Sequence, residues 1–116
     1  PAVEIDGAAL VDHVARRALR ETMSRNVGVL RRPDGLAAAH AVIDDLCAGA
    51  NVDVVPSIES FETTNLLTVA AAVVGSAELR TESRGCHRRV DFPSPVDAWR
   101  RHVAVRCEDG RMEFDA

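Results

Sequence analysis

The densest group of chemically capable side chains lies in residues 80–91, which read RTESRGCHRRVD. Guanidinium groups bind carboxylates through paired N–H donors, so these arginines and the neighbouring histidine could hold an anionic ligand. The same side chains could instead pair with one another and clasp a neighbouring domain, and arginines near a helix C-terminus also stabilise the helix dipole. We favour the structural interpretation. The candidate docking residues are Arg80, Glu82, Arg84, His87, Arg89 and Asp91.

The motifs give little support to nucleophilic catalysis, metal binding or phosphate binding. Cys86 lies among arginines and beside His87, a setting that favours a reactive thiolate, but no catalytic partners accompany it. Metal binding by this pair lacks further ligands at suitable spacing. The sequence has no Cys-x-x-Cys, His-Glu-x-x-His or Gly-x-Ser-x-Gly motif, and its seven glycines are isolated from one another, which excludes a glycine-rich phosphate loop. We predict no catalytic, cofactor-binding or metal-binding residue in this chain.

Length and composition indicate one helical domain. The 116 residues match the usual size of a single domain, and 47% hydrophobic with 28% charged residues is typical of a globular protein. Aromatic residues make up only 3%, whereas small aliphatic side chains that suit close helix packing are abundant. The net charge of -4 offers no basic field for nucleic acid or for an anionic membrane, so we expect neither as a partner.

Several features predict a cytoplasmic protein. Glu4 and Asp6 lie where a signal peptide would be basic. The longest nearly apolar run, Leu66 to Ala77, is about 12 residues and falls short of the roughly 20 that a membrane-spanning helix needs. The three cysteines have no paired spacing, which is typical of free thiols in a reducing compartment. The chain begins at Pro1 without a methionine, so we expect a piece of a longer protein.

Hydrophobic periodicity predicts three helices joined by short connections. The first covers residues 7–27 with Asp6 as its cap. The second covers residues 33–47, and the third begins after the capping residue Ser57. We therefore predict an all-α fold, in which residues 1–93 form a three-helix up-down-up bundle.

The third helix is apolar on nearly all sides. One face carries Phe61, Asn65, Leu66, Val69, Val73 and Ala77. Leu67, Ala70, Ala71 and Val74 fill much of the rest. Such a helix is expected at the centre of its domain, covered by neighbours on more than one side. The arginines of the first helix, by contrast, are predicted to lie on a solvated face; they are Arg16, Arg17 and Arg20.

Residues 94–116 are predicted to form an irregular tail packed on the bundle. The Asp109-Gly110 pair is a turn signal, so residues 103–107 and 112–114 could form a short β-hairpin. No other predicted strand offers that hairpin a sheet.

Three segments resemble one known family in order and spacing. Residues 80–93, with the pattern RxESRGxHxxxDFP, resemble a signature in the C-terminal helical domain of the succinate dehydrogenase, fumarate reductase and L-aspartate oxidase flavoproteins. Residues 23–31, MSRNVGVLR, look like the segment that closes the first helix in that family, and residues 65–70 look like the Asn-Leu stretch of its third helix. The RGCHRR sequence and the absence of tyrosine are more similar to L-aspartate oxidases than to succinate dehydrogenases, although Trp99 and His102 fit both.

The resemblance implies a role in pyridine nucleotide (NAD) biosynthesis. Its parent protein would oxidise L-aspartate to iminoaspartate with FAD, and quinolinate synthase is a candidate partner. The groups that bind FAD and substrate would belong to flavin-binding and capping domains of the same polypeptide, so Arg84 and His87 are not assigned catalytic roles. The chain alone would bind no FAD and would be inactive. Separated from those domains, it is expected to expose an apolar patch and to self-associate.

The sequence is also compatible with two alternatives. The chain could be the corresponding domain of a succinate dehydrogenase or fumarate reductase flavoprotein subunit, whose C-terminal region helps face an iron–sulfur partner. It could also be a free-standing helical interaction module. An upstream FAD-binding domain would exclude the second alternative, and co-purification with an iron–sulfur subunit would favour the first.

Overall fold

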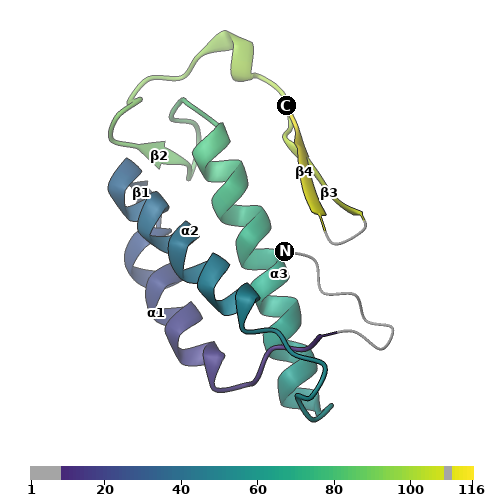
Figure 1. The fold of residues 1–116 in the computed structure, drawn as a ribbon. Helices are drawn as coiled ribbons and strands as arrows, with labels where there is room; N and C mark the ends of the chain where they lie inside the picture. Colours follow the sequence, from purple (N-terminus) through teal and green to yellow (C-terminus); the bar gives the residue numbers. More distant parts are fainter. Residues whose placement is uncertain (1–8, 109–110) are drawn as a thin grey trace.

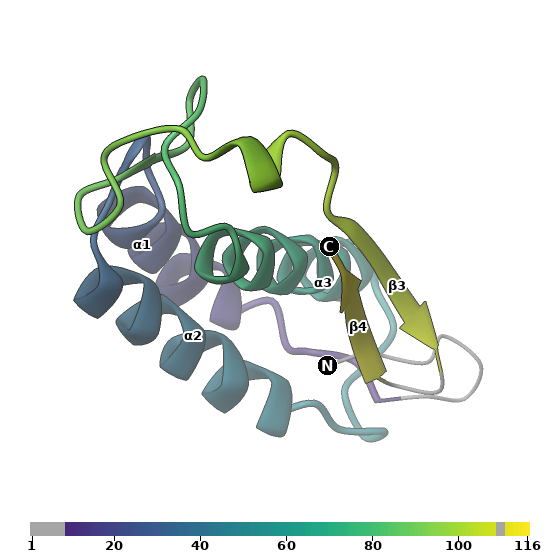
Figure 2. The ribbon, with the colours of Figure 1, turned by 90° about the horizontal axis from the view of Figure 1, so that it is seen from above.

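The computed structural model describes residues 9–108 and 111–116, and three helices dominate it (Figure 1). They are α1 (Ala15–Asn26), α2 (Pro33–Ala48) and α3 (Ile58–Leu79). The chain passes up, down and up through them, as the sequence predicts. Seen along the bundle, α1 and α2 lie on one side of α3 and a β-hairpin lies on the other (Figure 2).

The first helix begins later than the periodicity predicts. The expected cap Asp6 lies outside the described residues, and residues 9–14 are not α-helical. Leu10 instead forms a two-way backbone bridge with Asn51, and the Val11 N–H donates to Thr64 Oγ1 at 2.9 Å. Both apolar side chains are buried there. The helical spacing of apolar residues therefore continues into a segment that is not α-helical, because contacts with Asn51 and Thr64 hold Leu10 and Val11 in place.

The other helices begin where local chemistry predicts. Pro33 occupies the first turn of α2, where its missing N–H costs no hydrogen bond. Ser57 caps α3: its Oγ accepts from the Ser60 N–H at 3.0 Å, while Ser60 Oγ accepts from the Ser57 N–H at 2.8 Å. This reciprocal capping box satisfies two donors that a helix end leaves unpaired.

The core lies between the three helices and consists mainly of aliphatic side chains. Its buried members include Leu19, Leu36, Ala39, Ile43, Leu67, Ala70 and Val74. The buried alanines Ala39, Ala70 and Ala77 have small side chains that allow close helix packing, which suits a chain poor in aromatic residues.

The most apolar helix has neighbours on two sides, as predicted, but one of its apolar faces is open. The face of α3 that the bundle buries carries Ser60, Thr63, Thr64, Leu67, Ala70, Val74 and Ala77. Four apolar residues of the face predicted from the sequence are exposed, namely Phe61 (42%), Leu66 (45%), Val69 (61%) and Val73 (37%). The central position of α3, with neighbours on more than one side, is confirmed. The face that carries these four residues is nevertheless left open, because periodicity does not show which sides of a helix its neighbours will cover.

The C-terminal tail contains the short hairpin. Strands β3 (Ala104–Glu108) and β4 (Arg111–Asp115) pair antiparallel, with Val105 opposite Phe114. The predicted turn at Asp109-Gly110 lies outside the described residues. The ring of Phe114 packs directly over Gly75 of α3, so the hairpin rests on the helix rather than on another sheet.

Two further short strands join distant parts of the chain. Strand β1 (Leu30–Arg31) follows α1, and it pairs parallel with β2 (Arg88–Arg89), which follows α3. A 3-10 turn, η1 (Asp97–Trp99), precedes the hairpin. Among the described helices, none combines the length and the hydropathy that crossing a bilayer requires.

Candidate functional site

The six candidate docking residues, which we call the arginine cluster, come together just beyond the C-terminal end of α3. The chain leaves the helix at Leu79 and folds back in a tight turn closed by reciprocal backbone hydrogen bonds between Arg84 and His87. Gly85 adopts φ +57° in this turn, a left-handed conformation that glycine reaches without steric cost. The turn leaves Cys86 exposed at its tip.

Glu82 is the centre of the first half of the cluster. Its side chain is fully buried (0% exposed) and accepts hydrogen bonds from Arg84 Nε at 2.9 Å and Nη2 at 3.0 Å. It also accepts from Arg80 Nη1 at 2.7 Å and from the Val96 N–H at 2.9 Å. The hydrogen bonds from Arg84, aided by those from Val96 and Arg80 and opposed by burial, lower the pKa of Glu82 to about 2. The carboxylate is therefore ionised and held on several sides at neutral pH.

Arg89 is the centre of the second half. Only 7% of its side chain is exposed, and it binds Asp91 through Nε at 3.0 Å and Nη2 at 2.7 Å. The hydrogen bonds from Arg89 lower the pKa of Asp91. Arg89 Nη1 donates to the carbonyls of Ala77 and Glu78 at 3.1 and 2.8 Å, so it satisfies acceptors at the end of α3.

His87 connects the cluster to the segment after α1. Its Nε2 lies 2.9 Å from the Arg80 carbonyl, and its Nδ1 lies 2.8 Å from Arg31 Nη1. Burial lowers the pKa of His87, helped by the positive charges of nearby arginines, so the ring is neutral at physiological pH. Nε2–H must then donate to the carbonyl while Nδ1 accepts from Arg31. This contact lies beside the parallel pairing of β1 with β2, in which the Arg88 N–H donates to the Val29 carbonyl and the Val90 N–H to the Arg31 carbonyl.

The cluster works as an internal brace. Arg80 and Arg84 are both turned onto Glu82, and Arg89 onto Asp91, so the sites where an external carboxylate would bind are largely occupied from within the chain. Mutual pairing, the interpretation favoured from sequence, is therefore what the structure contains. Docking of another domain on these residues remains a prediction.

Two common kinds of site, a metal-ligand cluster and a dinucleotide-binding turn, do not occur among the described residues. No group of three or more histidine, cysteine or acidic side chains gathers in residues 9–108 and 111–116 in a way that could hold a metal ion. Binding FAD in a dinucleotide fold requires a parallel sheet with a glycine-rich turn at a helix N-terminus. The parallel strands found in this part of the chain are two residues long and precede no such turn.

Sequence reasoning missed several members of this site. Ser83, which is buried, accepts from the Arg89 N–H at 2.9 Å and donates to the Phe92 carbonyl at 2.7 Å. Arg80 also donates to the Trp99 carbonyl at 2.7 Å, and its guanidinium lies 5.4 Å from the centre of the indole ring. Ser83 lies within the RxESRG pattern, so the motif could have identified it as a member of the site. The Trp99 contact joins segments 19 residues apart, and nothing local predicts it.

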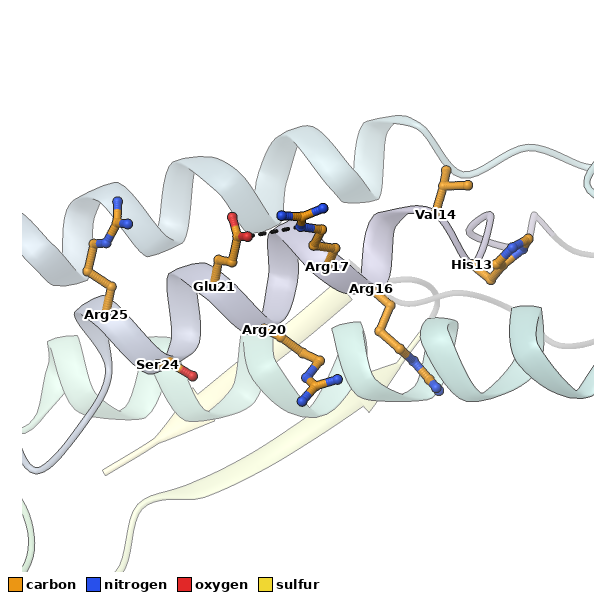
Figure 3. A pocket seen from close by; sticks show the side chains of 8 residues that line it. All are labelled: His13, Val14, Arg16, Arg17, Arg20, Glu21, Ser24 and Arg25. Carbon is orange, nitrogen blue, oxygen red and sulfur yellow. Dashed lines mark hydrogen bonds and ion pairs between the residues drawn. The ribbon is translucent and has the colours of Figure 1, made fainter.

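The arginines of α1 line a shallow open groove on the outside of the bundle (Figure 3). Arg17 pairs with Glu21 at 3.1 Å on an exposed surface, in agreement with the predicted solvated face. Arg16 is more enclosed and reaches Glu62 of α3 at 2.9 Å. Surface pairs of this kind contribute little to stability, about 0–1 kcal/mol each.

Comparison with known proteins identifies the family of this domain. Residues 16–116 match the family described as the fumarate reductase flavoprotein C-terminal region. The chain belongs to this family. The flavoprotein C-terminal family thus includes nearly all of α1 and everything that follows it, the arginine cluster among them.

Individual relatives agree with the family match. The L-aspartate oxidase of Streptomyces coelicolor is 39% identical over an alignment of 105 residues, and the match covers 84% of this chain and 18% of the relative. The L-aspartate oxidase of Mycobacterium tuberculosis is 39% identical over 94 residues, or 81% of this chain and 17% of the relative. An uncharacterised FAD-dependent oxidoreductase of Methanocaldococcus jannaschii is 35% identical, covering 76% and 17%. The chain therefore spans less than a fifth of the length of these relatives.

Proposed function

We propose that this chain is the non-catalytic C-terminal helical domain of an FAD-dependent L-aspartate oxidase, which converts L-aspartate to iminoaspartate for pyridine nucleotide (NAD) biosynthesis. The observation that carries the non-catalytic role is the buried carboxylate of Glu82, which occupies Arg80 and Arg84. Those arginines are the groups in the cluster best suited to holding a dicarboxylate substrate. Support for the parent activity comes from the names of the relatives.

In this proposal the domain supports the flavin-binding and capping domains of the same polypeptide. FAD belongs to those domains, and the 116-residue chain binds none. The cytoplasm is the proposed compartment, and quinolinate synthase is a candidate partner because it would consume the unstable imine product. A rigid bundle that ends in a brace of ion pairs is suited to holding a neighbouring domain in one orientation.

The decisive experiment compares the chain with its parent polypeptide. We expect flavin absorbance and L-aspartate-dependent peroxide production from the parent, and neither from the purified 116-residue chain. Flavin or activity in the isolated chain would overturn the non-catalytic role. Succinate oxidation by the parent, together with a co-purifying iron–sulfur subunit, would instead support the alternative of a succinate dehydrogenase or fumarate reductase flavoprotein, which the family description also accommodates.

Replacement of Arg84 in the parent separates the structural from the substrate-binding role. Arg84→Ala removes two donors from the buried Glu82, so we expect the thermal midpoint to fall while turnover per folded molecule is kept. The matched control is Arg88→Ala, an exposed arginine in the same segment. Loss of turnover at an unchanged thermal midpoint would assign Arg84 to the substrate.

A further inference from the structure

One side of α3 remains apolar where neither the helices nor the hairpin cover it. Leu66, Val69 and Val73 follow one another at spacings of three and four residues and are 45%, 61% and 37% exposed. We call these three residues the α3 stripe. No charged residue occurs between Glu62 and Glu78, so this side lacks the lysines and glutamates that normally cover a solvent-facing helix. Single exposed aliphatic residues are common, but a continuous row of them indicates an interaction surface.

The stripe continues into a shallow groove with a polar end. Val69 and Val73 line this groove together with Ala72 and Ser76, and its far end is formed by Arg31, Arg80 and His87. Ser76 and the alanines are small, so a partner could approach the helix backbone closely. A surface with an apolar centre and a polar rim has the composition of a protein–protein interface.

Positive charge borders this surface on two sides. Residues 80–102 contain six arginines against three carboxylates, in a chain whose net charge is -4. Arg16 and Arg20 project from the same side of α1 (Figure 3), and Arg16 reaches the first turns of α3 through its contact with Glu62. A partner with an apolar patch and acidic side chains at its rim would complement this arrangement.

We propose that the α3 stripe, bordered by Arg31 and Arg80, is the surface on which the preceding part of the parent polypeptide packs. This inference rests on the proposed function. The curated relatives are more than five times longer than the matched region, so most of such a polypeptide lies outside this domain. A covalent link keeps that part at high effective concentration, which makes it the favoured occupant of an open apolar surface. The arginine cluster would then brace the domain from inside and contribute only Arg80 and His87 to the edge of the interface.

Three matched substitutions in the parent polypeptide test this assignment. Val69→Glu places a carboxylate in the stripe, Val90→Glu places one beside the arginine cluster, and Val55→Glu places one in the exposed connector before α3. All three valines are exposed, at 61%, 41% and 78%, so each variant domain should fold. Thermal unfolding and circular dichroism of the three variants in the isolated 116-residue chain check this.

In the parent polypeptide, Val69→Glu is expected to detach this domain from the preceding part. Limited proteolysis that separates the domain from the preceding part of the parent should become roughly tenfold faster or more, because an unpaired carboxylate buried in an apolar interface opposes docking. Amide exchange in the exposed turns of α3 should rise with it. Val55→Glu should match the wild-type protein in both measurements, and Val90→Glu should match it closely.

The outcomes separate this inference from the proposed function. If Val69→Glu behaves like Val55→Glu in a parent that still holds flavin and oxidises L-aspartate, the docking surface is elsewhere and only this inference fails. If Val90→Glu releases the domain and Val69→Glu does not, docking occurs through the arginine cluster. A parent without flavin or aspartate oxidation would overturn the proposed function, whatever the proteolysis shows.

Discussion

At the scale of single residues, a group of arginines need not be a ligand site. Glu82 and Asp91 lie two residues from the arginines that bind them, so a short segment contains both the charges and their partners. The buried Glu82 carboxylate would be costly on its own, and it is accommodated because several donors replace the water it loses. The same donors would serve an external carboxylate only if Glu82 were absent.

Replacing Glu82 tests this brace through its pH dependence. The folded-state pKa of Glu82 is depressed from about 4.5 to about 2, so its contribution to stability is complete above the unfolded value and is lost as the pH falls through that range. We expect Glu82→Gln to be less stable than the wild-type chain at neutral pH, and the two to converge near about pH 2. Urea unfolding across the acidic range measures this. Glu113→Gln, on the exposed side of β4, is the control, and parallel pH profiles for Glu82→Gln and wild type would refute the assignment.

At the scale of elements, local sequence signals predict the starts of α2 and α3 and the presence of the hairpin. Ser57 and Pro33 mark true helix starts because capping and the fixed proline backbone act within one turn. The hairpin also forms as a local unit, but its position depends on a distant glycine. A Cβ at Gly75 would overlap the ring of Phe114, so the hairpin can lie this close only to a residue without a side chain.

Gly75→Ala is therefore expected to loosen the hairpin while leaving α3 intact. Alanine favours the helix by up to about 1 kcal/mol over glycine, but the Phe114 ring must move to admit the methyl group. Amide exchange in β4 should increase, while exchange in α3 should not. In a Phe114→Ala background the same substitution should be stabilising, so the two changes are non-additive. Equal stabilisation in both backgrounds would show that Phe114 does not pack on Gly75.

At the scale of the whole molecule, the domain is covered unevenly. The helices α1 and α2 cover one side of α3 and the hairpin covers the opposite side (Figure 2). The α3 stripe lies outside both, next to the arginine-rich end of the bundle. Such uneven burial is expected of a domain that completes its packing against another part of the same polypeptide.

The isolated chain is therefore expected to self-associate in a concentration-dependent way. Burial of apolar area favours association when no other domain covers the stripe. Light scattering or sedimentation over a wide range of concentration would detect it, and Val69→Glu should shift the protein to monomer while Val55→Glu should not. A wild-type chain that stays strictly monomeric at high concentration would contradict this expectation.

Much of this protein was predictable from its sequence because the relevant interactions are local. Periodicity and capping residues located α2 and α3 to within a few residues, and the Asp109-Gly110 signal located the hairpin. The RxESRG segment, with its neighbouring segments, pointed to the family that the comparisons then identified. The helix starts and the hairpin turn depend on residues that are close together in the sequence. The family is recognised from motifs in the sequence itself.

The tertiary structure alone decided everything that depends on distant partners. The segment before α1 is held by Asn51 and Thr64, and β1 pairs with β2 through backbone hydrogen bonds between segments more than 50 residues apart. The exposure of the α3 stripe depends on how many elements surround that helix. An apolar residue is equally apolar whether a neighbour covers it or not, so composition predicted a central helix and only the packed bundle revealed its open side.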